Sequence, residues 1–187
     1  MAARPQVHIT GASGAGVTTL GAALAARLGC AHLDTDDFYW HPTAPPYRVK
    51  RSVDERLARL HEAFAAASSG WVLSGSIGEW GAPLLPLFDL VVYVYTPTEL
   101  RLERLRRREA ETFGAANVAP GGPRHQEYVE FLDWASRYDH GDRPGRSRAL
   151  HEAWLAELPC PLLRVDGARA IAELVAEVAE VVEARPR

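Results

Sequence analysis

The sequence predicts an α/β fold in which helices cover both faces of a parallel β-sheet. Short apolar runs alternate with helical patterns along the whole chain, which is the order expected of β-α-β units with right-handed crossovers. Residues 90–95 are apolar without interruption, so this strand is expected to be covered on both faces, as in parallel sheets. A glycine-rich turn joins the first strand to the first helix, and ligands of such sheets lie beyond the carboxyl ends of the strands.

Five strands, with helices between them, are expected in order along the chain. Apolar residues spaced three or four apart mark the helices, and Gly29 ends the first of them. The strands are expected at 7–10, 31–34, 71–74, 90–95 and 162–165. The helices are expected around 20–28, 53–64, 98–113, 128–135, 150–158 and 171–182.

Length and composition bound the class of protein. The chain has 187 residues, 47% of them hydrophobic, so residues 1–187 are expected to form one domain with one core. Within it, 38–69 is expected to be a substrate-binding segment and 101–146 a lid region. A net charge of −3 without a basic face predicts neither nucleic acid nor a membrane as a partner. Two cysteines and no signal-like segment predict a cytoplasmic protein, and a monomer and a homodimer both fit this composition.

The turn after the first strand carries the strongest motif. Its sequence follows the pattern G-x-x-x-x-G-K-[ST], in which backbone N–H groups cradle phosphates and the hydroxyl binds Mg²⁺. Val17 stands where this pattern has lysine. The residues expected to bind the cofactor phosphates are Gly11, Ala12, Ser13, Gly14, Ala15, Gly16, Val17, Thr18 and Thr19.

The sequence of this turn leaves two alternatives to phosphate binding. One is a strand-to-helix turn without a ligand, and the other is the dinucleotide-binding turn of short-chain dehydrogenases. The glycine spacing of that family differs, and Lys50, the only lysine, leaves no Tyr-x-x-x-Lys pair. The chain also has no H-E-x-x-H zinc motif and no G-x-S-x-G nucleophile turn, so phosphate binding is favoured.

The missing lysine removes a charge-assisted hydrogen bond of about 1.5–3 kcal/mol, so phosphoryl transfer needs another cation. Arg101, Arg104 and Arg108 are spaced to share one face of the helix 98–113, where they would form an anion clamp. We expect Arg104 or Arg108 to supply the catalytic charge. A solvated, charge-laced helix surface is the alternative for each arginine taken singly.

Three aspartates follow the second strand, where they are expected to face the phosphate loop across the strand ends. Because Mg²⁺ prefers one or two carboxylates with water and phosphate oxygens, Thr18 and Asp34 are expected to hold the metal. Asp36 is expected to be the catalytic carboxylate that contacts or deprotonates the acceptor. Capping of a helix is the alternative role for one of these aspartates.

A second glycine-containing turn follows the third strand at the same edge of the sheet. It carries polar donors near an aromatic residue, and basic residues between 48 and 56 add positive charge, which favours an acidic or phosphorylated acceptor. Core packing of the aromatic ring and a solvated helix face are the simpler alternatives. The expected substrate-binding residues are Asp34, Asp36, Asp37, Arg51, Arg56, Ser74, Gly75, Ser76 and Trp80.

With these motifs in view, the chain resembles the adenylate-kinase-like and shikimate-kinase-like branch of P-loop kinases over nearly its whole length. The likeness rests on the motifs at 11–19, 34–40 and 71–76 and on the arginine helix that enters the lid. It implies the three-layer P-loop NTPase fold with a sheet order of 2-3-1-4-5. It also implies ATP and Mg²⁺ as cofactors, with Gly167 beside the base of the nucleotide.

The resemblance also implies an activity, the transfer of the terminal phosphate of ATP to a small-molecule or nucleotide acceptor. The alternative is a nucleotide-binding module without kinase turnover that acts as a regulatory or interaction protein. Val17 motivates this alternative, because a loop without lysine can still cradle phosphate through its backbone.

Overall fold

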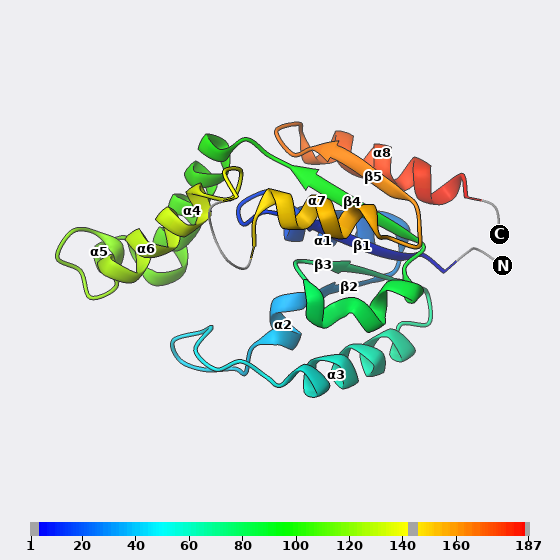
Figure 1. Ribbon diagram of the computed structural model, residues 1–187, viewed down its shortest axis with the longest axis horizontal. Helices are drawn as coiled ribbons and strands as arrows, with labels where there is room; N and C mark the ends of the chain where they lie inside the picture. The colour runs from blue at the N-terminus through cyan, green and yellow to red at the C-terminus, as the bar shows by residue number, and fades with distance from the viewer. Residues whose placement is uncertain (1–3, 142–145, 186–187) are drawn as a thin grey trace.

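The computed structural model describes residues 4–141 and 146–185 as three layers, with one sheet between two sets of helices (Figure 1). All five strands are parallel and lie in the order β2-β3-β1-β4-β5, which confirms the predicted fold and sheet order. No strand departs from its expected range by more than one residue at either end. The strands are β1 (Gln6–Gly11), β2 (Ala31–Asp34), β3 (Trp71–Ser74), β4 (Leu90–Tyr95) and β5 (Leu162–Asp166).

The predicted helices are present, together with three segments that the apolar spacing did not indicate, α2, η1 and α5. Asp34 accepts a hydrogen bond from Asp36 N at 3.0 Å and so caps α2. η1 is a 3-10 helix that contains Pro83 and Pro86, which lack the N–H donors of a regular α-helix. The helices are α1 (Val17–Leu28), α2 (Thr35–Tyr39), α3 (Val53–Ala66), η1 (Glu79–Leu87), α4 (Thr98–Phe113), α5 (Ala115–Val118), α6 (His125–Ser136), α7 (Arg148–Ala156) and α8 (Ile171–Glu183).

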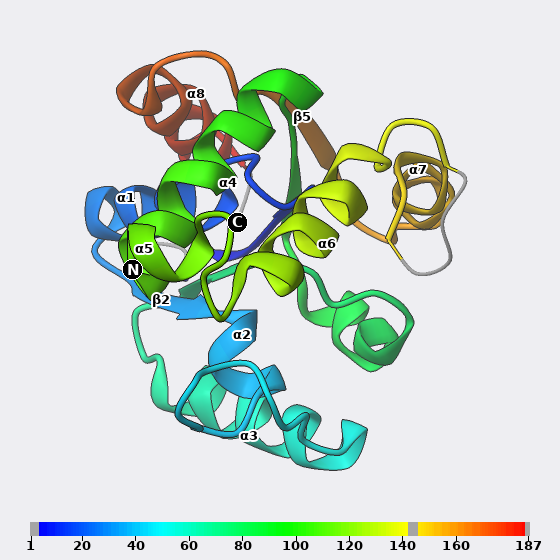
Figure 2. The same ribbon diagram turned by 90° about the vertical axis from the view of Figure 1, so that its left-hand side faces the viewer.

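Two apolar clusters hold the helices against the sheet. α1 and α8 cover one face, where Leu24 and Val178 are fully buried. α3, η1 and α7 cover the other face with Leu60, Leu84 and Leu155 (Figure 2). Burial on both sides explains why the strand β4 is apolar at every position.

The carboxyl ends of the strands meet at one edge, beyond which α4, α5 and α6 project as an arm (Figure 1). The parallel register places Asp34 beside Ser74 and Gly11 beside Val94 at this edge. In the same view α2 and the connection that follows it lie below the arm. Within the described part of the chain, no helix has the length and apolar character needed to span a membrane.

A buried chain of hydrogen bonds anchors α7 to the sheet. The hydroxyls of Tyr93 and Tyr138 lie 2.7 Å apart, and the Tyr138 hydroxyl lies 2.7 Å from His151 Nδ1. His8 on β1 is fully buried, and its Nε2 has no hydrogen-bond partner among the described residues. Burial lowers the pKa of His8 to about 3 and the pKa of His151 to about 4. Both imidazoles are therefore neutral at physiological pH.

Because of these two buried histidines, we expect the free energy of unfolding to fall in mild acid. Their folded pKa values lie below the value of 6.5 taken for the unfolded chain, so the unfolded state binds more protons below that pH. Stability is complete above the unfolded pKa, and we expect it to fall by about 3 kcal/mol on acidification to about pH 5.5. Urea denaturation of His151→Gln should show about half the wild-type dependence on pH in this window.

Exposed His61 provides the matched control, because His61→Gln should keep the wild-type dependence of the unfolding free energy on pH. If His151→Gln and wild-type protein lose stability equally on acidification, the buried histidines do not cause the loss.

Candidate active site

A cleft of about 1240 Å³ opens at the carboxyl ends of the strands. The loop 11–19 forms its floor, the ends of β2 and β3 with α2 form one wall, and α4 and α6 line it from the arm. The structure brings most of the predicted site residues to this cleft. They are Gly11, Ala12, Ser13, Gly14, Ala15, Gly16, Val17, Thr18, Thr19, Asp34, Asp36, Asp37, Gly75, Ser76, Arg104 and Arg108.

Glycine shapes the loop on the floor of the cleft. Gly14 and Gly16 have φ values of 80° and 96°, a region that side chains other than glycine rarely adopt. A Cβ atom at Gly14 would lie 2.6 Å from the carbonyl oxygen of Arg101, so the loop also packs closely against α4. α1 begins directly after Gly16. Its unpaired N–H groups and the positive end of its dipole suit an anion in the cleft.

The position at which the loop motif has lysine is occupied by a core side chain. Val17 is 8% exposed and belongs to the apolar cluster that also contains Ile9 and Val94. It reaches the cleft only as part of the apolar lining. The loop therefore contributes backbone donors and a helix dipole but no cation.

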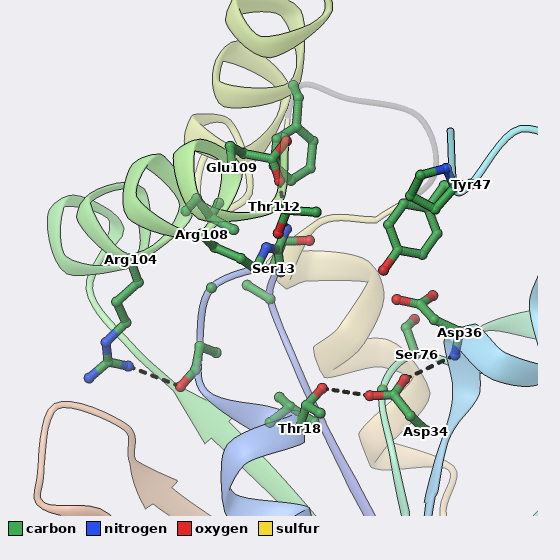
Figure 3. Close-up of a pocket in the computed structure, with 18 of the residues that line it drawn as sticks. Ser13, Thr18, Asp34, Asp36, Tyr47, Ser76, Arg104, Arg108, Glu109 and Thr112 are labelled. Carbon is green, nitrogen blue, oxygen red and sulfur yellow. Dashed lines mark hydrogen bonds and ion pairs between the residues drawn. The ribbon is translucent and has the colours of Figure 1, made fainter. Parts of the chain in front are cut away.

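Thr18 and Asp34, the two predicted metal ligands, are brought together. Thr18 Oγ1 donates to Asp34 Oδ2 at 2.8 Å, and Asp34 Oδ1 accepts from the backbone N–H of Asp36 (Figure 3). Asp34 thus combines the capping role with a position beside the phosphate loop. One hydroxyl and one carboxylate are hard oxygen donors, and together they fit Mg²⁺ that completes its shell with water and phosphate oxygens.

Asp36 opens into the cleft, and the hydroxyl of Tyr47 points toward its carboxylate (Figure 3). Enclosure by the surrounding protein raises the pKa of Asp36, and the negative charge of Asp34 adds to this, while Arg146 and Arg108 oppose it. A raised pKa makes a carboxylate a better proton acceptor. The surroundings of Asp36 therefore suit a general base.

The first arginine of α4 does not join the expected anion clamp. Arg101 is completely buried, and its side chain is not part of the cleft lining. Its guanidinium donates to the carbonyl oxygens of Thr96 at 3.1 Å, Ser13 at 3.3 Å and Ala135 at 3.1 Å. Arg101 thus ties the phosphate loop to α4 and α6.

The other two arginines of this face have different surroundings. Arg104 donates to the carbonyl oxygens of Ala15 at 3.3 Å and Gly167 at 3.0 Å, and Figure 3 shows it on the side of the loop away from the aspartates. Gly167 follows β5 and does not line the cleft, but it packs closely against the loop, since a Cβ atom there would lie 2.9 Å from the carbonyl oxygen of Ala15. Arg108 is 55% exposed and contacts Glu109 of its own helix at 3.3 Å.

Four predicted substrate-binding residues lie behind the cleft wall instead of lining it. Arg51 is buried and donates to Glu55 at 2.9 Å. Arg56 is buried with its guanidinium 3.8 Å from the centroid of the Tyr39 ring. Arg51 and Arg56 therefore do not give the cleft the positive charge expected from the sequence, and Arg48, which does line the cleft, is paired with Glu127. The four residues are Arg51, Arg56, Ser74 and Trp80.

The cleft also contains residues that sequence reasoning did not single out. Phe131 and Trp134 stack on α6 with ring centroids 6.0 Å apart, and both line the cleft. Arg146, just before α7, lies with Nη1 3.4 Å from Ser13 Oγ. The three-residue spacing of these two rings is the sequence signal that could have indicated a shared face. Nothing local pointed to Arg146, which meets Ser13 across 133 residues of sequence.

One ion pair joins the two sides of the cleft mouth. Arg48, in the connection after α2, donates to both carboxylate oxygens of Glu127 on α6, at 2.8 and 3.0 Å. Both side chains are about half exposed, so the pair contributes at most about 1 kcal/mol to stability. Its effect is to hold the arm near the aspartate side.

Comparison with known proteins agrees with this geometry. The chain is 43% identical to the uncharacterized protein YqaC of Bacillus subtilis over 175 residues, which cover 94% of this chain and 96% of that protein. Shikimate kinase from Acinetobacter baumannii in complex with shikimate has a similar structure, with a TM-score of 0.52 and 18% identity, covering 96% of this chain and 93% of that one.

An unliganded sugar kinase from a Janibacter species has a TM-score of 0.50 and 14% identity, over 97% of this chain and 96% of that one. At these identities the likeness concerns the fold, which is that of P-loop small-molecule kinases. Residues 7–118, more than half of the chain, match the family described as AAA domain. The chain therefore belongs to the AAA domain family.

Proposed function

We propose that the protein is an ATP-dependent phosphotransferase that moves the terminal phosphate of ATP to a small-molecule or nucleotide acceptor. The observation that carries this proposal is the hydrogen bond between Thr18 on the phosphate loop and Asp34 on β2. It sets a carboxylate beside the phosphate cradle, and Asp36 opens into the same cleft. Donor phosphates, the two proposed metal ligands Thr18 and Asp34 and the proposed general base Asp36 would thereby share one cavity.

The loop and the start of α1 would bind the phosphates through backbone N–H groups and the helix dipole. Mg²⁺ bound at Thr18 and Asp34 would neutralise charge on the phosphates and favour in-line displacement. Gly167, which is bridged to the loop by Arg104, would lie beside the adenine base of ATP. Arg108 lines the cleft and would add positive charge on the arm side.

Asp36 would take the proton of an acceptor hydroxyl. As that O–H bond breaks, the acceptor oxygen forms a bond to the terminal phosphorus, and the bond from this phosphorus to ADP breaks. Asp34, Asp37, Gly75 and Ser76 would border the acceptor, since they line the cleft beside Asp36. In this proposal Arg51, Arg56, Ser74 and Trp80 support the acceptor wall from behind.

The alternative function is a nucleotide-binding module without turnover. The observation that favours it is Val17, which leaves the loop without its own cation. Such a module would bind ATP through the same backbone cradle but would transfer no phosphate. For either function we place the protein in the cytoplasm, where ATP is abundant, in keeping with the free thiols of Cys30 and Cys160.

Calorimetric titration with ATP tests whether Thr18 and Asp34 bind Mg²⁺. Wild-type protein should bind ATP about 10-fold more tightly with Mg²⁺ than with a chelator, and Asp34→Asn should lose most of this difference because the carboxylate charge is gone. Asparagine caps helices as well as aspartate does, so the variant keeps α2. Thr18→Val should also lose the Mg²⁺ effect.

Asp133→Asn is the control, since Asp133 is about half exposed on the arm and should retain the full Mg²⁺ effect. Absence of ATP binding by wild-type protein would refute the proposed function. If Mg²⁺ raises the ATP affinity of both Asp34→Asn and Thr18→Val as much as that of wild type, Thr18 and Asp34 are not the metal ligands.

A further inference from the structure

Arg146 lies beside the phosphate loop. In this loop Val17 stands at the position where the motif has a charged lysine. Arg146 Nη1 is 3.4 Å from the Ser13 hydroxyl, in the middle of the loop, and its side chain lines the same cleft. The loop itself has no basic side chain between Gly11 and Thr19. Arg146 therefore brings a guanidinium to the loop from a distant segment of the chain.

The arginines of α4 are less well placed for this role. Arg101 is buried against three backbone carbonyls, and Arg104 is bonded to the carbonyls of Ala15 and Gly167. Arg108 lines the cleft, but it is 55% exposed and its guanidinium is paired with Glu109. Of these four arginines, Arg146 alone donates a hydrogen bond to a side chain of the loop.

Within the described residues 4–141 and 146–185, no carboxylate forms an ion pair with Arg146. Its contacts there are the neutral Ser13 hydroxyl and the Trp134 ring, whose centroid lies 5.8 Å from the guanidinium carbon. Burial lowers the pKa of Arg146, and the negative charge of Asp36 opposes this effect. A partly buried guanidinium whose hydrogen bond and ring contact are both to neutral groups gains from an anionic ligand.

The residue that follows Arg146 is anchored at the start of α7. Ser147 is buried and caps α7 by accepting from Leu150 N at 3.3 Å. α7 is tied to the sheet through the hydrogen bonds of His151, Tyr138 and Tyr93. The neighbour of Arg146 in the chain is thus held on a rigid part of the fold.

We propose that Arg146 replaces the missing loop lysine and binds the terminal phosphate of ATP. This inference rests on the proposed function. The guanidinium donates to Ser13 of the loop, and Asp36 lines the same cleft, so Arg146 shares one cavity with both the phosphate cradle and the acceptor side. The planar guanidinium makes two parallel hydrogen bonds to a phosphate, and its charge stabilises the phosphate in the transition state.

Competitive titration of ATP and ADP in Mg²⁺ buffer tests this role, because ADP lacks the terminal phosphate. Arg146→Ala should weaken ATP binding about 10- to 100-fold and ADP binding less than about 3-fold. Arg146→Lys should recover part of the ATP affinity, because lysine keeps the charge without the planar fork. Arg137→Ala, which removes an exposed arginine paired with Asp133, should bind both nucleotides as wild type does.

Three results would overturn the inference: unchanged ATP affinity in Arg146→Ala, equal losses for ATP and ADP, or a selective ATP loss confined to Arg108→Ala. If wild-type protein binds ATP and Arg146→Ala binds it equally well, this inference fails while the proposed function stands. If wild-type protein binds neither nucleotide, both fail.

Discussion

Asp36→Asn is expected to slow phosphoryl transfer about 100- to 10,000-fold, the usual contribution of a general base. Asparagine is nearly the same size but cannot accept the proton of the acceptor hydroxyl. ATP affinity should stay the same or rise, because removal of a negative charge near the phosphates weakens no contact to them. The loss should therefore be in the rate of the bound complex and not in nucleotide binding.

Single-turnover transfer from radiolabelled ATP, with ATP affinity measured in parallel, checks this prediction. Asp133→Asn, on the outer surface of the arm, should transfer phosphate at the wild-type rate. If Asp36→Asn transfers phosphate at a rate within about 3-fold of the wild-type rate, Asp36 is not the general base.

Arg101→Met is expected to lower the free energy of unfolding by about 3–5 kcal/mol, as when one partner of a buried charged network is removed. The completely buried guanidinium bonds to three carbonyl oxygens and to Thr98 Oγ1, and it forms an ion pair with Asp139 at 3.4 Å. Methionine fills a similar volume but leaves these acceptors without their donor. Urea denaturation without nucleotide measures the loss.

Arg106→Met is the matched control for Arg101→Met. Arg106 is exposed on the same helix, so its replacement should change stability by less than about 0.5 kcal/mol. Equal stability losses in the two variants would show that the buried network of Arg101 does not hold the loop, α4 and α6 together.

Much of the fold could be predicted because the relevant signals are local. The apolar run of β4 indicated burial on both faces, and the glycine pattern at 11–18 placed the phosphate loop between β1 and α1. Asp34 was expected beside this loop because the carboxyl ends of parallel strands share one edge, and the structure sets it 2.8 Å from Thr18. The capping alternative for an aspartate also holds, since Asp34 caps α2.

The surroundings of the arginines could not be predicted in the same way. Helical spacing places Arg101, Arg104 and Arg108 on one face, but it does not tell which carbonyls and carboxylates lie opposite each of them. In the same way, the sequence did not show that Arg51 pairs with Glu55 or that Arg56 stacks on the Tyr39 ring behind the cleft wall. Arg146 stands just before α7, which packs on one face of the sheet, and it meets the loop across 133 residues of sequence, a long-range relation without a local pattern.

The central claim is that this lysine-free cleft transfers phosphate, and single-turnover reaction of the full chain with ATP labelled on the terminal phosphate tests it most directly. With Mg²⁺ and a pool of small metabolites and nucleotides, we expect label to move from ATP to one acceptor, and we expect Asp36→Asn to slow this transfer by about 100-fold or more. Tight binding of ATP with no label transferred to any compound in the pool would contradict the account and favour the nucleotide-binding module.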